Sequence, residues 1–197
     1  MESIDEFQVI QSVLRGDREA YAALVRLYHG RVLSLCLSML LDRAEAEDAA
    51  QEAFVKAFAS LNQYTRNASF SAWLYRIASN HCLDLLRKRK RQKTDSLDGL
   101  MEQKGDSVSD FESKIPEKSG SGAEKQETLD LAMRVLGTLP PDYRQVLILR
   151  ELEGLTYEEI SSVLKCSLDA VKSRLRRARQ QLQEKARHFL NPQSFTK

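Results

Sequence analysis

Glycine, proline and cysteine are all scarce in this sequence of 197 residues, which contains eight, four and three of them respectively. Cys36, Cys82 and Cys166 lie far apart with no Cys-x-x-Cys pair, so neither a disulfide framework nor a zinc site is predicted. Each falls at an apolar position, and we expect core packing because free cysteine is commonly buried. Few turn-forming residues between long segments with a period of about 3.6 residues predict an all-α fold.

Residue patterns used for catalysis and cofactor binding are missing as well. His29, His81 and His188 are scattered, and no Gly-rich phosphate loop, carboxylate cluster or nucleophile motif occurs. We therefore expect no catalytic residue, no metal site, no cofactor and no small-molecule substrate, and we assign the histidines to surface or packing roles. The protein is not expected to be an enzyme.

Long uncharged apolar runs are also absent, because none reaches the roughly 18 residues of a membrane-spanning helix. The acidic start, from Met1 to Glu6, differs from the basic start and apolar core of a signal peptide. Hydrophobic residues make up 42% of the chain, which is enough for real cores, and charged residues make up 29%. We expect a cytoplasmic protein with no direct membrane insertion.

The formal net charge of +2 conceals a strongly uneven distribution along the chain. Residues 87–93 hold six positive charges and no negative one, and residues 165–187 hold eight bases against two acids. Between these basic segments, residues 94–130 hold ten acids against four lysines. Clustered Lys and Arg favour phosphate, so two basic poles predict two nucleic-acid contacts. Solvated helix faces are the alternative, but they do not explain six bases within seven residues.

The apolar pattern predicts two small helical domains joined by a flexible acidic linker, over residues 1–93, 124–190 and 94–123 respectively. The linker has too few large apolar side chains to offset the entropy of ordering it. Four helices are expected in the first domain, beginning near residue 3, Asp17, Arg43 and Phe70. The second and third helices carry apolar stripes in which Leu27 and Phe58 are expected to face the core.

A helix-turn-helix is predicted in the second domain. Thr156 and Glu159 form a capping box, Lys165-Cys166 makes a tight turn, and Ser167 is a natural N-cap for the next helix. That next helix has an apolar inner face and a basic outer face, which is typical of a recognition helix that enters a major groove. The alternative is a helical hairpin whose basic face confers only solubility.

Several segments of the sequence resemble bacterial RNA polymerase sigma factors, in the order in which that family has them. Asp48 to Phe58 resembles the polymerase-binding signature, Phe70 to Asn80 the helix that reads the −10 promoter element, and Arg87 to Lys93 its basic end. The −35-reading domain of the family is similar to the helix-turn-helix together with Leu139, Pro140, Arg144 and Val146. The first domain is joined directly to the second by a short tether. This domain order resembles the extracytoplasmic-function (ECF) group.

The resemblance implies a factor that binds core RNA polymerase and directs promoter-specific initiation by reading −35 duplex and −10 single-stranded DNA. Contacts with the β′ clamp of the polymerase are implied for Asp48, Gln51, Glu52 and Val55. Contacts with −10 DNA are implied for Lys56, Tyr64, Arg66, Arg76, Asn80, Arg87 and Lys88. Contacts with −35 DNA are implied for Lys172, Ser173, Arg174, Arg176, Arg177 and Arg179. Trp73 lies close to the apolar stripe, and we expect it to pack in the core.

Further partners implied by the resemblance are the β flap of the polymerase and an anti-sigma factor. The linker of about 30 residues reaches up to about 100 Å when extended. Promoter elements about 25 base pairs apart need about 85 Å at roughly 3.4 Å per pair, which the linker can span. Two alternatives remain open. A helix-turn-helix repressor or activator would need a dimerisation element, and a nucleic-acid enzyme would need a catalytic cluster; the sequence shows neither.

Overall fold

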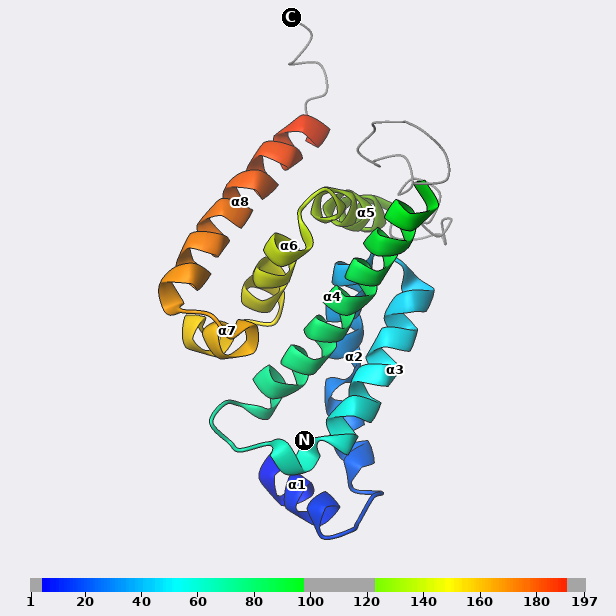
Figure 1. The fold of residues 1–197 in the computed structure, drawn as a ribbon, viewed down its shortest axis with the longest axis vertical. Coiled ribbons are helices and arrows are strands. Elements are labelled where there is room, and N and C mark those ends of the chain that lie inside the picture. The colour runs from blue at the N-terminus through cyan, green and yellow to red at the C-terminus, as the bar shows by residue number, and fades with distance from the viewer. Residues whose placement is uncertain (1–4, 98–122, 191–197) are drawn as a thin grey trace, which may run out of the picture.

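The computed structural model describes residues 5–97 and 123–190, and every regular element in these two ranges is helical (Figure 1). The first range contains α1 (Glu6–Leu14), α2 (Tyr21–Leu40), α3 (Arg43–Ala59), the 3-10 helix η1 (Leu61–Gln63) and α4 (Phe70–Leu97). The second contains α5 (Ala123–Gly137), α6 (Pro141–Leu147), the π-helix η3 (Ile148–Leu152), α7 (Tyr157–Leu164) and α8 (Leu168–Leu190). The all-α prediction is confirmed, while most of the expected linker lies outside the described residues.

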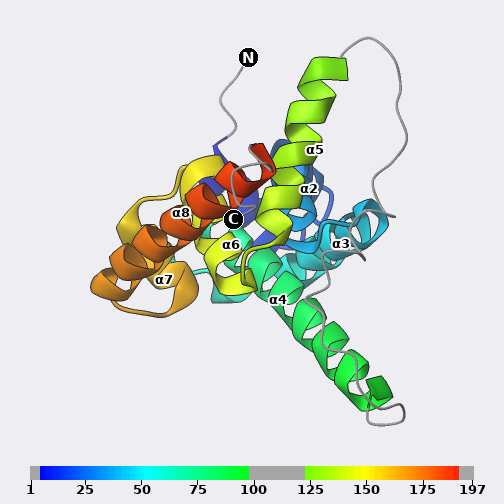
Figure 2. The same ribbon diagram turned by 90° about the horizontal axis from the view of Figure 1, so that it is seen from above.

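Helix α2 forms the centre of the first helical domain, with α1, α3 and α4 packed around it (Figures 1 and 2). The inner face of α3 consists largely of small side chains that are almost fully buried, namely Ala46, Ala49, Ala50, Ala53 and Ala57. Small side chains on this face let α2 and α4 pack close to α3. Cys36 and Cys82 are buried in the same core, as expected, and Cys166 is half-buried.

The core positions expected for Leu27 and Phe58 are wrong, as is the inward position expected for Leu168, which is 37% exposed, and one helix is longer than expected. Leu27 is 45% exposed and Phe58 is 38% exposed, because both lie at the margin of their apolar stripes, where neighbouring helices no longer cover them. Phe58 packs edge-on against Tyr21 at a ring-centroid distance of 5.0 Å. Helix α4 continues past the basic cluster to Leu97, and its C-terminal part projects beyond the rest of the molecule (Figure 2).

Among the described residues, α2 is long and apolar enough to meet the criterion for a membrane-spanning helix, which the sequence pattern did not predict. It has 20 residues, and 44% of its apolar 18-residue window is buried inside the protein. Its buried side chains, which include Leu24, Val32 and Leu35, contact the other helices of the first domain. The core position of α2 accounts for its apolar composition.

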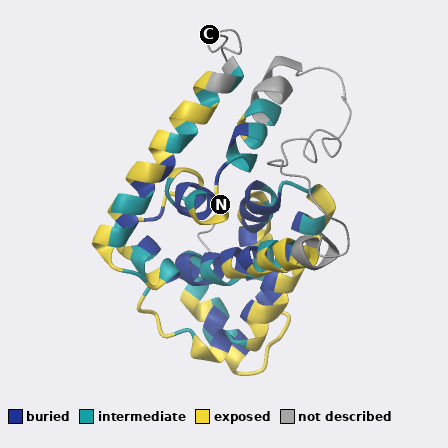
Figure 3. Ribbon diagram, turned by 45° about the horizontal axis from the view of Figure 1, so that its top comes forward, coloured by how far each residue is buried: buried dark blue, intermediate teal, exposed yellow. Residues whose placement is uncertain are grey.

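The second helical domain is built around α6, α7 and α8. Pro141 occupies the first turn of α6, where the missing N–H of proline costs no hydrogen bond. The buried side chains that join these helices are Val146, Leu149, Leu155, Ile160, Val163, Val171 and Leu175. Exposed residues follow the outer face of α8, away from this core (Figure 3).

The two domains are in contact, with α6, η3 and α7 packed on α2 and α4. Arg144 of α6 is 5% exposed, and its Nη1 donates a hydrogen bond to the carbonyl oxygen of Met39 at the end of α2, at 2.6 Å. Its Nη2 donates to the carbonyl oxygens of Gly137 and Leu139, each at 3.1 Å. Burial lowers the pKa of Arg144 to about 10, so the guanidinium remains charged at neutral pH.

Candidate polymerase and nucleic-acid interfaces

The outward face of α3 carries the four residues predicted to contact the polymerase. Asp48, Gln51, Glu52 and Val55 are all exposed, opposite the buried alanines, and Val55 is 61% exposed. Asp42 caps the helix by accepting a hydrogen bond from the Glu45 N–H at 3.0 Å, which fixes where the helix begins. The result is an apolar side chain flanked by carboxylates on a rigid helix, a surface suited to binding a protein with basic groups.

The loop that follows η1 is held by its own aromatic packing and by α1. The Tyr64 hydroxyl donates to the carbonyl oxygen of Ala68 at 2.9 Å, and the Tyr64 ring packs against Phe70 and Trp73 with centroid distances of 5.6 and 5.5 Å. Arg66 has a positive φ of 60°, and its guanidinium lies 3.9 Å above the Phe7 ring of α1. Helix α1 therefore helps to fix this loop, a role that sequence reasoning missed.

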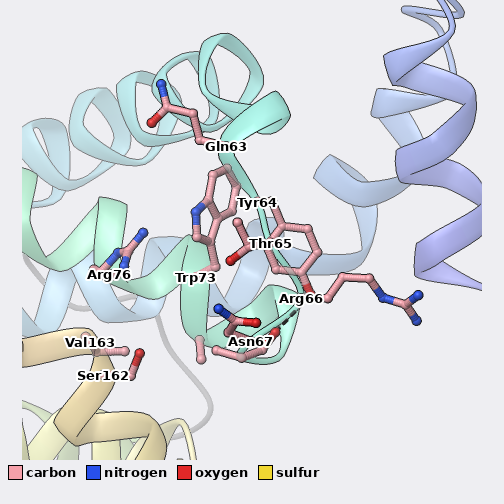
Figure 4. Close-up of a pocket in the computed structure, with 11 residues that line it drawn as sticks. Gln63, Tyr64, Thr65, Arg66, Asn67, Trp73, Arg76, Ser162 and Val163 are labelled. Atoms are coloured by element: carbon pink, nitrogen blue, oxygen red, sulfur yellow. Dashed lines mark hydrogen bonds between the residues drawn. The ribbon is translucent and has the colours of Figure 1, made fainter.

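A cavity of about 160 Å³ lies between this loop and α4 (Figure 4). Trp73 and Arg76 of α4 form one side, and the loop residues, among them Thr65 and Asn67, form another. Trp73 is 7% exposed, which confirms its core packing, yet its ring also lines the cavity. Of the predicted −10 residues, the structure brings Tyr64, Arg66 and Arg76 to this cavity; the Arg66 side chain extends away toward α1 (Figure 4).

Lys56 and Asn80 are absent from the residues that line this cavity. The Lys56 ammonium donates to Nδ1 of His81 at 2.8 Å and lies 3.8 Å from the Glu52 carboxylate. Asn80 is exposed and precedes His81 on α4. Five of the predicted −10 residues thus form two groups, one at the cavity and one where α3 and α4 meet. His81 joins the second group although no sequence motif singled it out.

The environment of His81 predicts that the stability of the protein depends on pH. Burial, followed by the positive charge of Lys56, lowers the pKa of His81 below its ordinary value of 6.5, and Glu52 and Asp84 only partly offset this. The unfolded chain then binds this proton more readily than the folded one, so the free energy of unfolding falls as pH drops below about 6.5. We expect His81→Gln to reduce this acid sensitivity in urea denaturation between about pH 7 and 5. A wild-type slope retained in the variant would contradict the assignment.

The basic end of α4 is partly neutralised by neighbouring carboxylates. Arg87 Nη1 lies 3.1 Å from Asp84, and Arg89 pairs with Glu45 of α3. Lys88 is exposed. This part of α4 therefore combines a rigid helix with positive charges at its surface, an arrangement suited to phosphate contacts.

The predicted helix-turn-helix is confirmed in detail. Thr156 Oγ1 accepts from the Glu159 N–H at 3.1 Å, while the Glu159 carboxylate accepts from the Thr156 N–H at 2.9 Å, which completes the capping box. Lys165 adopts the left-handed conformation with φ of 50° and ends α7. Ser167 Oγ accepts from the Ala170 N–H at 3.2 Å and so caps α8. These local bonds set the angle at which α8 leaves the turn.

The outer face of α8 is basic, but its polar side chains differ in exposure and in the partners that they already have. Lys172, Arg176 and Arg177 are exposed, and Ser173 and Arg174 are half-buried. The Arg179 guanidinium is held by Glu151 of η3, with two hydrogen bonds of 2.6 and 3.0 Å. Arg176 and Arg177 are therefore the arginines of this face that are best placed to bind DNA.

An apolar groove lies on the second domain, on the side formed by α5, α6, η3 and α8. Its volume is about 480 Å³, and it is lined by Leu131, Ala132, Val135, Leu136, Leu147, Ile148, Glu151, Leu152, Leu182 and Ala186. Leu152 is 56% exposed at its edge. No group of three or more His, Cys, Asp or Glu suited to a metal ion occurs within the part of the chain that the structure describes.

Comparisons with known proteins match both domains in order. Residues 24–92 match the family model for Sigma-70 region 2, and residues 129–182 match that for Sigma-70, region 4. The RNA polymerase sigma-H factor of Pseudomonas aeruginosa is 39% identical over 178 residues, which cover 88% of this chain and 89% of that protein. The ECF RNA polymerase sigma factor SigW of Bacillus subtilis is 33% identical over 186 residues, covering 90% and 95%. The sigma factor RpoE of Bartonella quintana, solved in complex with the anti-sigma factor NepR, has a TM-score of 0.64 and 27% identity, covering 84% of this chain and 95% of that one.

Proposed function

The chain belongs to the extracytoplasmic-function sigma factors of the sigma-70 family, and on this premise we propose which of its surfaces bind polymerase and which bind promoter DNA. As a sigma factor it directs promoter-specific transcription initiation. The observation that carries the proposal is that one chain presents, in the family's order, a carboxylate-flanked helix, a loop-and-helix cavity and a capped helix-turn-helix.

Core polymerase docks on the exposed face of α3, through the β′ clamp. Val55 supplies apolar contact, and Asp48 and Glu52 supply charge that basic groups of the clamp can complement. The apolar groove of the second domain accepts the β flap, since it is concave and lined almost wholly by apolar side chains. Two docking sites on separate domains would hold the factor across a large polymerase surface.

The cavity between α4 and the loop that follows η1 captures an unpaired −10 base. Trp73 offers a ring for stacking, Asn67 an amide for a base edge, and Arg76 a positive charge for the adjoining phosphate. Each stacked base is worth about 1–3 kcal/mol, which helps to stabilise an opened strand. Lys56, in the group where α3 and α4 meet, and the basic end of α4 contact the phosphate backbone of the same strand.

The outer face of α8 reads the −35 duplex in the major groove, with Arg176 and Arg177 as its principal arginines. The protein itself catalyses nothing and acts in the cytoplasm, where the polymerase carries out RNA synthesis. By analogy with the Bartonella quintana factor, whose solved complex contains an anti-sigma factor, an inhibitory protein partner is also proposed.

Run-off transcription from fragmented genomic DNA of the source organism tests this function directly. We expect core RNA polymerase to produce defined new transcripts only when the protein is added, and alignment of their start sites to yield shared −35 and −10 elements. If no transcript depends on the protein, while the protein alone binds specific duplexes, a conventional repressor or activator would replace this proposal.

A further inference from the structure

The Lys56 ammonium is held by an uncharged group. Its Nζ donates a hydrogen bond to Nδ1 of His81 at 2.8 Å, where α3 and α4 meet. An ammonium carries only donors, so Nδ1 is the acceptor, and the imidazole is neutral with its proton on Nε2. Burial, followed by the positive charge of Lys56, lowers the pKa of His81 below 6.5, which keeps the ring in this neutral form at pH 7.

A neutral partner orients a cation without cancelling its charge. Arg89, further along α4, pairs instead with the Glu45 carboxylate, so a large part of its charge is already neutralised. Glu52 competes for Lys56, but its carboxylate lies 3.8 Å from Nζ. The two side chains of this pair are 46% and 49% exposed, so water and salt screen their attraction. The charge of Lys56 therefore stays available to a phosphate.

The position of His81 is itself fixed by α4. The residue is half-buried and lies between the exposed Asn80 and Cys82, which is buried in the core. A lysine side chain is long and flexible, and ordering it on binding costs conformational entropy. Because Lys56 is already hydrogen-bonded to a ring on a rigid helix, less ordering remains to be done when DNA binds.

We propose that His81 is a positioning residue for capture of the −10 strand, which as a neutral acceptor holds the Lys56 ammonium in place for the phosphate backbone. The inference rests on the proposed assignment of Lys56 to −10 DNA. His81 acts through Lys56 and does not itself contact the strand. Glu52 belongs to the face proposed to dock on polymerase, so docking engages the competing carboxylate and leaves His81 as the partner of Lys56.

Two substitutions at position 81 separate the hydrogen bond from the bulk of the side chain. His81→Gln retains a neutral acceptor in its amide oxygen, whereas His81→Leu has no acceptor. The measurement is the dissociation constant of holoenzyme, at saturating core polymerase, for a fluorescent single-stranded oligonucleotide that carries the nontemplate −10 sequence of a promoter mapped with the wild-type factor. At about pH 8 we expect His81→Leu to weaken binding about fivefold and His81→Gln to stay within about twofold of wild type.

The control removes an imidazole from elsewhere in the same domain. His29→Leu, on the exposed surface of α2, should bind the oligonucleotide like wild type. Wild-type affinity in His81→Leu, or an equal loss in His81→Leu and His81→Gln, would overturn the proposal.

Lys56→Met tests the assignment on which the inference rests. It should weaken binding of the same oligonucleotide about tenfold and reduce the slope of log affinity against log salt by about 0.7. Adding His81→Leu to Lys56→Met should cost nothing further, because His81 acts through Lys56. Unchanged binding in Lys56→Met would reject the assignment of Lys56 to −10 DNA, and the role of His81 with it. A loss in Lys56→Met but none in His81→Leu would keep the assignment and reject only that role.

The pH profile distinguishes positioning from direct contact with DNA. The charged groups that face His81 are Lys56 and Glu52 of α3 and Asp84 of α4. An imidazolium cannot accept the hydrogen bond and repels the ammonium, so as pH falls from about 8 to about 5.5 the wild type should lose affinity for the oligonucleotide relative to His81→Gln, whose amide does not titrate. A gain in wild-type affinity over His81→Gln in acid would mean that the imidazolium binds phosphate itself, and would overturn the positioning role.

Discussion

Reversing two charges on α3, with Asp48→Lys and Glu52→Lys combined, is expected to lower affinity for core RNA polymerase at least about 100-fold. The two carboxylates flank the exposed Val55, and docking would bring them against basic groups of the clamp. Truncating one partner of a buried charge pair costs about 2–5 kcal/mol, and reversal adds repulsion, so a loss of about 2.7 kcal/mol is a conservative expectation. Fluorescence anisotropy of the labelled protein titrated with core polymerase gives the dissociation constants of the wild type and of the variant.

The matched control changes the same amount of charge elsewhere. Glu19→Lys combined with Glu158→Lys alters two exposed residues, one in the turn before α2 and one in the first turn of α7. This variant should bind core within about threefold of wild type. Circular dichroism should show that both variants are as helical as wild type. If the α3 variant binds like wild type, or if both variants weaken alike, then α3 is not the docking surface.

The parts of the fold that could be predicted from the sequence are those fixed by neighbouring residues. The capping box of Thr156 and Glu159, the turn at Lys165 and the cap at Ser167 each involve atoms a few residues apart, so residue type and spacing are enough to specify them. The outward face of α3 was predictable for a similar reason, because a stripe of buried alanines leaves the opposite face exposed.

What could not be predicted depends on contacts between distant segments. Ser69 and Glu159 are 90 positions apart, and nothing in either segment indicates that they meet. The pairing of Lys56 with His81 likewise depends on how α3 crosses α4, which a helical period does not specify. Phe7 gave no signal for its contact with Arg66 beyond its apolar character. Prediction of burial at the margins of apolar stripes fails for the same reason, as at Leu27, because burial there depends on which helix lies opposite.

The largest loss of promoter recognition is expected from the double substitution Arg176→Ala and Arg177→Ala on α8. Both side chains are exposed on the face that would enter the −35 major groove. An arginine bound bidentately to guanine contributes about 1–3 kcal/mol of base discrimination, and each phosphate contact adds about one to the slope of log affinity against log salt. We expect run-off transcription from promoters mapped with the wild-type factor to fall at least about 30-fold, while core binding stays unchanged.

A charge-matched control lies on the same helix, because Arg179→Ala with Arg187→Ala removes two exposed arginines that are not its proposed principal DNA contacts. The Arg179 guanidinium is already hydrogen-bonded to Glu151, so its loss should weaken the contact between α8 and η3 more than it weakens DNA binding. Alanine favours helix, which keeps α8 intact in both variants. Transcription that falls equally in the two would mean that α8 attracts promoter DNA only through its total charge. Selective loss in the first would place sequence reading at Arg176 and Arg177.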